Sequence, residues 1–298
     1  MITGRSPRAV DAPGRAGARI PGVIGHAGLA AHRDGGAPNR ACLRRARRID
    51  VDALEIDLVA TADDALVLHH DLRHRSGSLI AGLTLAELRA LDQQLLTLDE
   101  AVEELDGLMP LVLDVKSIAV VAPLCGWLSR WGNRLDLVVC TEHAAALERL
   151  RHSAPDVHIW RTFPDVGARV DQRVLRVISG LLAHRGTRAL RAAGDAWQAL
   201  TFVRDSPRDA VAHISGLPWR NMLPLLLAGV RERLDAGGIT VHHPLVTREL
   251  CDEAHALGME VIAWTVNDPV AARRLMACGV DMITTDRVEE IRDAVLSA

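Results

Sequence analysis

The chain has 298 residues, of which 49% are hydrophobic and 24% are charged, the balance of an ordinary globular protein. This length fits one large α/β barrel or two smaller domains. The net charge of -3 gives no reason to expect a nucleic acid or an acidic membrane surface as a partner, and no uninterrupted apolar stretch is long enough to span a bilayer. We therefore predict no nucleic-acid partner and no stable membrane insertion. The oligomeric state stays open.

The first twenty residues differ in composition from the remainder of the chain. They are rich in Arg, Gly, Pro and Ala and lack the apolar segment of a secretory signal, so we predict a disordered leader over residues 1–20 and a single domain over residues 21–298. The five cysteines are scattered and show no C-x-x-C spacing. This pattern favours reduced thiols over a disulfide framework and predicts a cytoplasmic protein.

Short β-like runs alternate with helical patterns along the rest of the chain. The predicted strands cover residues 23–26, 54–58, 66–69, 111–115, 137–140, 157–160, 239–242, 261–266 and 281–284. The predicted helices cover residues 40–49, 85–91, 119–130, 144–152, 248–257 and 269–277. Strands that alternate with helices indicate βαβ units and a parallel sheet.

One of the nine predicted strands does not fit a parallel sheet. A parallel pair needs a connection of a dozen or more residues, and the turn-like segment Thr61-Ala62-Asp63-Asp64 is too short for one. Residues 66–69 should therefore return antiparallel, as a hairpin on the rim. The eight remaining strands predict a TIM (β/α)8 barrel. Residues 170–237 are predicted to form a helical insertion between its fifth and sixth strands, broken at Pro207 and Pro218.

Carboxylates gather at the ends of the predicted strands, where the catalytic residues of a TIM barrel lie. Glu55 and Asp57 are two residues apart and so point to one face of their strand, and Asp114 occupies the next parallel strand. Three carboxylates facing one barrel interior would repel one another unless they bind a cation. An all-oxygen site favours Mg²⁺ or Ca²⁺ over zinc. The alternative is a solvated strand face, or a cap on a neighbouring helix.

Two histidines and one lysine flank these carboxylates. His26 closes the first strand and His70 ends the rim hairpin, so both can act as acid and base beside the cation near neutral pH. Lys116 is the only lysine among 35 basic residues, and its compact ammonium would balance the charge of a phosphoryl group. These residues predict metal-assisted phosphoester cleavage. Structural histidines, a plain Asp114–Lys116 ion pair and a lysine count set by base composition are the alternatives.

Six segments, in this order, resemble the glycerophosphodiester phosphodiesterase family. They are His26-Ala27-Gly28, Leu54-Glu55-Ile56-Asp57, His70-Asp71, Leu113-Asp114-Val115-Lys116, Trp264-Thr265-Val266-Asn267-Asp268 and Ile283-Thr284-Thr285-Asp286-Arg287. The segments that begin at Thr84 and Thr97 also look like that family. The resemblance runs from about Val23 to Asp286, apart from the predicted insertion.

The resemblance implies a TIM barrel that hydrolyses glycerophosphodiesters, which are small molecules, to glycerol phosphate and an alcohol with the help of a divalent metal. The implied roles are His26 and His70 for acid–base catalysis, Glu55, Asp57 and Asp114 for the metal, and Trp264 for the substrate pocket. The predicted substrate contacts are Lys116, Trp264 and Asn39. Asn39 keeps its place in a further family motif, which reads Ala37-Pro38-Asn39-Arg40 here.

The chain departs from the family pattern at three of these positions. Ala27 stands where the family has an arginine expected to contact phosphate, Pro38 stands where it has a glutamate, and Asp114 is shorter than the usual glutamate. We expect Arg33 or Arg40 to reach in from the loop after the first strand. Two alternatives stay open: a phospholipase-D-like lyase that stops at a cyclic phosphate, and a degenerate barrel that binds a phosphodiester without turnover.

Overall fold

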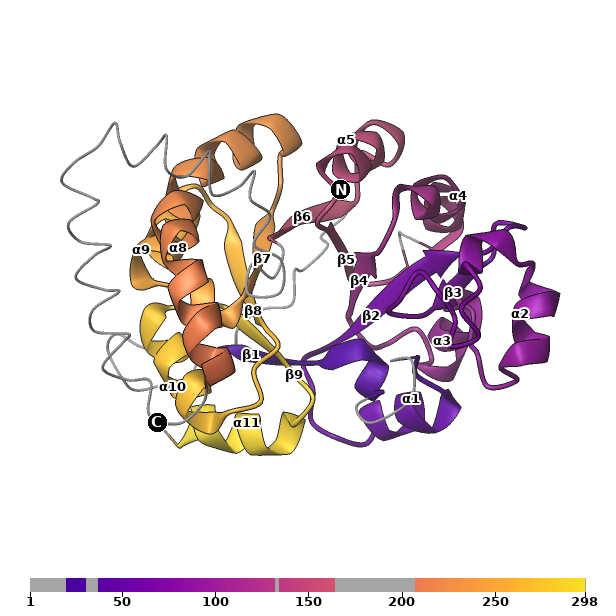
Figure 1. Ribbon diagram of the computed structural model, residues 1–298, viewed down its shortest axis with the longest axis horizontal. Coiled ribbons are helices and arrows are strands. Elements are labelled where there is room, and N and C mark those ends of the chain that lie inside the picture. The colour runs from indigo at the N-terminus through magenta and orange to yellow at the C-terminus, as the bar shows by residue number, and fades with distance from the viewer. Residues whose placement is uncertain (1–19, 31–36, 132–133, 164–206, 298) are drawn as a thin grey trace.

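The computed structural model describes residues 20–30, 37–131, 134–163 and 207–297, with the backbone alone over residues 207–219 (Figure 1). Apart from Ile20, the predicted leader lies outside the described residues. The same is true of residues 170–206 of the predicted insertion.

The centre of the molecule is a closed parallel sheet. Its strands, including one rim strand, are β1 (Gly22–Gly25), β2 (Ala53–Ala60), β3 (Leu66–Leu68), β4 (Leu111–Val115), β5 (Leu137–Thr141), β6 (His158–Phe163), β7 (Gly238–His242), β8 (Glu260–Trp264) and β9 (Met282–Thr285). Parallel neighbours follow the order β1-β9-β8-β7-β6-β5-β4-β2, and pairing of Ile24 in β1 with Ala53 in β2 closes the ring. The predicted TIM barrel is therefore confirmed.

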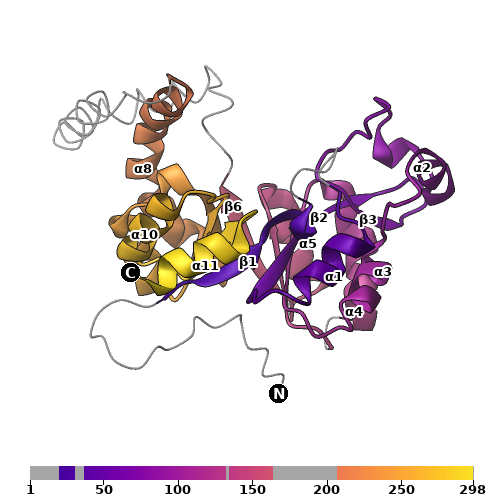
Figure 2. The same cartoon turned by 90° about the horizontal axis from the view of Figure 1, so that it is seen from below.

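The rim hairpin is also confirmed. β3 pairs antiparallel with β2, and Leu68 lies opposite Leu58. The turn between the strands is closed by Thr61, whose hydroxyl accepts a hydrogen bond from the Ala65 amide at 2.9 Å, while Asp64 takes the left-handed conformation with φ 62°. Because the connection is a turn and not a crossover helix, the second strand returns beside the first. Figure 2 shows β3 and the neighbouring α2 on the side of the barrel away from α10.

Helices cover the outer side of the sheet (Figure 1). They are α1 (Arg40–Ala46), α2 (Leu85–Leu91), α3 (Leu98–Glu104), α4 (Val121–Trp131), α5 (Ala144–Ser153), α8 (Pro207–Leu234), α9 (Arg248–Ala256), α10 (Pro269–Cys278) and α11 (Val288–Leu296). α2 and α3 begin at capping boxes, in which Thr84 pairs with Glu87 and Thr97 with Glu100. Neither α3 nor α11 belongs to the predicted set, and α1 ends three residues before its predicted end at Ile49.

The predicted break at Pro218 is wrong. α8 begins at Pro207, as expected for a proline in the first helical turn, but it continues through Pro218 to Leu234. A proline removes one backbone hydrogen bond from a helix, and a long helix can continue past that loss. α8 ends just before β7, so this part of the predicted insertion is the helix that precedes the sixth parallel strand.

Two sets of apolar side chains fill the two faces of the sheet. The inner set lies inside the barrel and consists of Ile24, Ala53, Val112, Val138, Cys140, Trp160, Ile262 and Met282. The outer set packs the strands against the helices. Both faces of every parallel strand are thus covered, which explains the nearly continuous apolar runs in the sequence.

Trp160 is the largest side chain of the inner set, and Gly238 makes room for it. A Cβ atom on Gly238 would lie 2.6 Å from Cδ2 of Trp160 and 2.7 Å from the carbonyl oxygen of Glu260. Neither neighbour can retreat easily, because Trp160 is 1% exposed and Glu260 presents its backbone. The absence of a side chain at Gly238 is therefore a packing requirement of the barrel.

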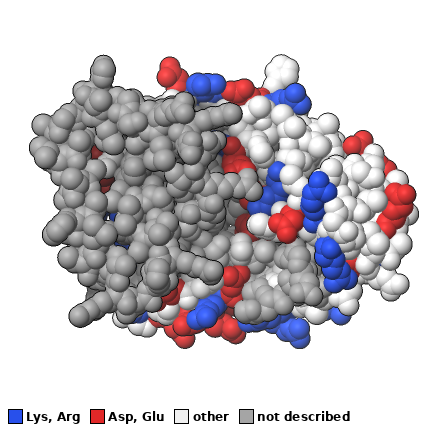
Figure 3. Space-filling model, viewed as in Figure 1, with Lys and Arg blue, Asp and Glu red and all other residues white. Residues whose placement is uncertain are grey.

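The surface of the described residues carries charges of both signs. On the face shown in Figure 3, acidic and basic side chains are interspersed over the described part. Among the described helices, none is both long enough and apolar enough to cross a membrane.

We expect Gly238→Ala to destabilise the protein by about 1–3 kcal/mol, the usual cost of overpacking a filled core. Urea unfolding followed by circular dichroism measures this loss. Gly229→Ala in α8 is the matched control, since nothing lies within 4 Å of its added Cβ and alanine favours a helix. Equal stability of the Gly238→Ala variant and the wild type would contradict this account of the barrel interior.

Candidate active site

Three carboxylates converge inside the mouth of the barrel. Glu55 and Asp57 face inward from β2, and Asp114 lies in register with Asp57 on the adjacent β4. One oxygen atom from each carboxylate can be chosen so that all three lie within 4.8 Å of one another. Glu55 and Asp57 are buried and Asp114 is nearly so. The structure therefore brings together the three residues that the sequence predicted as metal ligands.

Lys116 pairs with two of these carboxylates. Its ammonium nitrogen lies 2.6 Å from Oδ1 of Asp57 and 2.6 Å from Oδ2 of Asp114. The second oxygen of Asp57, Oδ2, is buried and has no hydrogen-bond partner among the described residues. A buried carboxylate oxygen without a partner is costly, and it is the kind of atom that a cation would satisfy.

The ionisation of the cluster is governed by burial and by Lys116. Burial and the charge of Asp57 raise the pKa of Glu55 well above its ordinary value, and burial raises the pKa of Asp114. Burial would also raise the pKa of Asp57, but nearby positive charge, above all that of the Lys116 ammonium, has the larger combined effect and lowers it. Burial alone would lower the pKa of Lys116, but Asp57 and Asp114 raise it. One ammonium thus faces a cluster of three carboxylates, and these residues fit a divalent cation.

His26 is held by a chain of hydrogen bonds across the barrel mouth. Its Nδ1 lies 2.8 Å from Oδ1 of Asp286, and Oδ2 of Asp286 accepts a hydrogen bond from Nδ2 of Asn267 at 2.7 Å. Burial lowers the pKa of His26, but the hydrogen bond to Asp286 and the charges of Glu55 and Asp286 overcome it and raise the pKa to about 9. His26 is therefore fixed in orientation and favoured as the protonated imidazolium.

The turn after β1 connects this histidine to the carboxylates. It is the short helix η1 (His26–Leu29), in which Ala27 and Gly28 take left-handed conformations with φ 46° and φ 60°. This backbone directs the Ala27 amide at Oε2 of Glu55, 2.7 Å away. A Cβ atom on Gly28 would lie 2.7 Å from the ring of Pro38. Two of the three residues that depart from the family pattern, Ala27 and Pro38, thus lie at this turn.

His70 lies on the rim, after the hairpin strand β3. Its side chain is 52% exposed, and its Nδ1 is 2.9 Å from Oδ1 of Asp71. Its charge contributes to the shifts of the Asp57 and Asp114 carboxyls, where it lowers the pKa in opposition to burial. The second predicted histidine is therefore the more exposed of the two, since the side chain of His26 is 28% exposed.

Trp264 lies at the end of β8, with its ring centroid 5.3 Å from that of His242 on β7. The indole Nε1 is buried and makes no hydrogen bond within the described part of the chain. Because each of these side chains comes from the carboxyl end of a barrel strand, Trp264 and His242 share the mouth with the carboxylates.

Two residues predicted to reach the site are engaged elsewhere. Asn39 caps α1, since its Oδ1 accepts a hydrogen bond from the Cys42 amide at 3.1 Å, and its Nδ2 donates to Gln94 at 2.9 Å. Arg40 pairs with Glu104 at 3.0 Å on the outside of the barrel, so the expectation that it replaces the missing arginine is wrong. The position of Arg33 lies outside the described residues.

Asp286 and Asn267 are functional candidates that residue-type reasoning missed. Both fall within segments that resemble the family. The spacing of residues along the chain does not indicate a contact with His26, since Asp286 is 260 residues away from it. Their place in those shared segments was the available signal. Only the closure of β9 against β1 brings them to His26.

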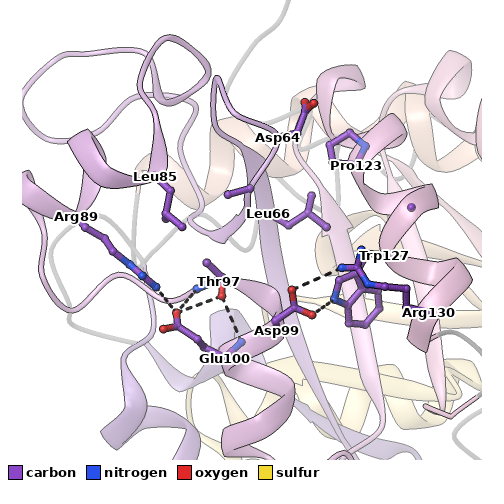
Figure 4. Close-up of a pocket in the computed structure, with 12 residues that line it drawn as sticks. Asp64, Leu66, Leu85, Arg89, Thr97, Asp99, Glu100, Pro123, Trp127 and Arg130 are labelled. Carbon is purple, nitrogen blue, oxygen red and sulfur yellow. Dashed lines mark hydrogen bonds and ion pairs between the residues drawn. The ribbon is translucent and has the colours of Figure 1, made fainter.

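A cavity of about 560 Å³ lies apart from the carboxylates (Figure 4). It is bounded by the rim hairpin, α2, α3 and α4, and several of its polar groups already pair with one another. Trp127 donates its indole N–H to Asp99 at 2.8 Å, and Arg89 pairs with Glu100 at 2.5 Å (Figure 4). Among the described residues, the three carboxylates that could share a cation lie at the barrel mouth and do not line this cavity.

Comparison with known proteins identifies the family. A model of the glycerophosphoryl diester phosphodiesterase family matches residues 41–290. The chain belongs to this family. It is accordingly a phosphoric diester hydrolase, as the order of its motifs predicted.

Individual relatives of this phosphodiesterase span most of its length. The chain is 25% identical over 264 residues to a probable glycerophosphodiester phosphodiesterase 2 of Mycobacterium tuberculosis, covering 85% of this chain and 83% of the relative. A phosphodiesterase of Oleispira antarctica, solved with the product sn-glycerol-3-phosphate, superimposes with a TM-score of 0.64 at 21% identity, covering 93% and 97% of the two chains. A putative glycerophosphoryl diester phosphodiesterase of Silicibacter pomeroyi gives a TM-score of 0.67 at 21% identity, covering 98% and 96%. These structures support the barrel fold.

We expect Asp286→Asn to lower kcat of the phosphodiesterase by roughly 10- to 100-fold, the usual effect of removing a partner that orients a site residue. The amide keeps the shape of the side chain but removes the charge that supports the His26 imidazolium. Steady-state kinetics on a phosphodiester substrate measures the loss.

The neighbouring Asp268→Asn is the matched control for this variant. Asp268 caps α10 by accepting hydrogen bonds from the Val270 and Ala271 amides, and asparagine caps helices equally well. This control should keep the wild-type kcat. A wild-type kcat in the Asp286→Asn variant would show that Asp286 does not support His26 in catalysis.

Proposed function

We propose that the chain hydrolyses glycerophosphodiesters to glycerol phosphate and an alcohol, using a divalent cation held by Glu55, Asp57 and Asp114 and acid–base catalysis by His26 and His70. The observation that carries the proposal is the convergence of three carboxylates within 4.8 Å in a mouth that also holds a lysine and the fixed His26. The bound product of the Oleispira antarctica phosphodiesterase supports the choice of glycerol phosphate for this chain.

The donor set supports Mg²⁺ or Ca²⁺ as the cation. All three candidate ligands are carboxylates, which hard divalent cations prefer, and Oδ2 of Asp57 has no other partner among the described residues. When bound, the cation would supply Lewis-acid polarisation of the phosphoryl group. Both Mg²⁺ and Ca²⁺ suit this set of donors.

Side chains of the protein would transfer the protons and stabilise the charge that develops on the phosphoryl group. His26 is the acid, because the Asp286 hydrogen bond favours its protonated form, and it gives its proton to the leaving alkoxide oxygen. His70 is the base, and it takes the proton from the glycerol hydroxyl that attacks phosphorus. The cyclic phosphate formed in this step is opened by water, with the histidines in reversed roles. The Lys116 ammonium stabilises the charge on the phosphoryl oxygens.

The remaining substrate contacts lie around this centre. Trp264 presents a flat apolar ring and a buried N–H donor, which suits the carbon face and a hydroxyl of a glycerol unit. Asn39 already donates one amide hydrogen to Gln94 and accepts a hydrogen bond from the Cys42 amide. We therefore assign Trp264 the larger part in substrate binding.

Removal of the cation tests the metal site. EDTA should abolish cleavage of glycerophosphocholine by the purified protein, and added Mg²⁺ or Ca²⁺ should restore it. Asp57→Asn should abolish cation binding measured by isothermal titration calorimetry, because the site loses one of its three carboxylates. Asp99→Asn, on α3 beside the separate cavity, is the control that should bind the cation normally. Full activity in EDTA would contradict the proposal.

Replacement of the histidines tests acid–base catalysis. His26→Ala and His70→Ala should each lower kcat by roughly 10²- to 10⁴-fold, the usual contribution of a positioned acid or base. His152→Ala on α5, where the side chain is exposed, should leave kcat unchanged. Phosphorus NMR of the products separates the hydrolase from the lyase, because glycerol phosphate supports the proposal and a persistent cyclic phosphate contradicts it.

A further inference from the structure

Lys116 occupies an unusual place in both the sequence and the site. It is the single lysine of a chain with 35 basic residues, the others being arginine. Its side chain is 21% exposed and makes two contacts of 2.6 Å, one with Asp57 and one with Asp114. A lysine ammonium is a compact point charge, whereas the arginine guanidinium is a broad planar fork. The space between two carboxylates of adjacent strands therefore suits lysine.

The same two carboxylates belong to the site proposed for the divalent cation. Asp57 and Asp114 lie directly opposite each other on β2 and β4, so their charges repel unless a positive group lies between them. Lys116 supplies that group from within the chain. Oδ1 of Asp57 accepts the contact from Lys116, whereas Oδ2 of Asp57 has no hydrogen-bond partner within the described residues. A second cation on these carboxylates would repel the ammonium at short range, where Coulomb forces are strong.

We propose that Lys116 is a built-in competitor of the divalent cation: it neutralises Asp57 and Asp114 when the site holds no cation, and it gives up this pairing when the cation binds. The inference rests on the proposed function, because it takes Glu55, Asp57 and Asp114 as the cation site. It also orders the events of catalysis. Lys116 becomes available to the phosphoryl oxygens once the cation has taken over the two carboxylates, so cation binding would prepare the site for substrate.

Cation affinity measured without substrate tests the competition. Lys116→Met keeps an unbranched chain of similar length but removes the charge. Titration calorimetry with Mg²⁺ alone and with Ca²⁺ alone should show a dissociation constant at least about tenfold lower than that of the wild type, because the repulsion has gone. The thermal unfolding midpoint without cation should fall, because Asp57 and Asp114 lose their counter-ion, and it should rise on addition of the cation by more than in the wild type.

Arg292→Met is the matched control. Arg292 is also a partly buried base, 17% exposed, that pairs with an aspartate, since its guanidinium lies 2.8 Å from Oδ2 of Asp52. Asp52 precedes β2, so this pair lies at the opposite end of the barrel from the carboxylate cluster. The control should lower the unfolding midpoint and leave the dissociation constant unchanged. Equal or weaker cation binding by Lys116→Met would overturn the proposal and would show that Lys116 only positions the carboxylates.

The single lysine allows a second test that needs no substitution at Lys116. Protein labelled with ¹³C at lysine Cε gives one side-chain signal, which requires no assignment, because the chain has one lysine. Addition of Mg²⁺ to the wild type should move this signal in proportion to the occupancy measured by calorimetry. An unchanged signal at saturation would overturn the proposal. If the wild type binds neither Mg²⁺ nor Ca²⁺, the proposed cation site itself fails, and this outcome is distinct from binding that Lys116 does not affect.

Discussion

The structure of the active site depends on the burial of three carboxylates in the mouth of a closed sheet. An unpaired buried carboxylate is so costly that it becomes protonated or finds a counter-ion. The chain does both, since burial raises the pKa of Glu55 to about 8 and Lys116 lies between Asp57 and Asp114. This compromise explains how the barrel can carry the cluster without a cation. It also leaves one oxygen of Asp57 without a partner among the described residues.

The turn after β1 joins this cluster to the other side of the mouth. The Ala27 amide holds Glu55 on β2, while the preceding residue, His26, is held by Asp286 at the end of β9. Three neighbouring strands, β9, β1 and β2, therefore fix His26 and Glu55 relative to each other. The left-handed backbone at Ala27 and Gly28 makes this possible, and Pro38 packs against the glycine that the turn requires.

The departures from the family pattern bear on the positive charge of the site as far as the described residues show it. Ala27 brings no guanidinium, and Arg40 pairs with Glu104 outside the mouth. Within the described residues, Lys116 is the base that contacts the carboxylates directly. In the proposed mechanism the phosphoryl charge is therefore balanced by Lys116, by the imidazolium of His26 and by the cation. In that mechanism the same ammonium would serve both the metal-free protein and the bound substrate.

The sequence by itself determined the barrel, the rim hairpin and the gathering of Glu55, Asp57 and Asp114. These features depend on local rules: period-two alternation, the minimum length of a crossover, and the convergence of parallel strand ends at one edge. Tertiary structure alone decided which hydrogen-bond partners the candidate site residues have. The Asp286 carboxylate reaches His26 only because the sheet closes, and Asn39 donates a hydrogen bond to Gln94, which is 55 residues away in the chain. Such pairings depend on the register of strands far apart in the chain, which no local pattern of residues records.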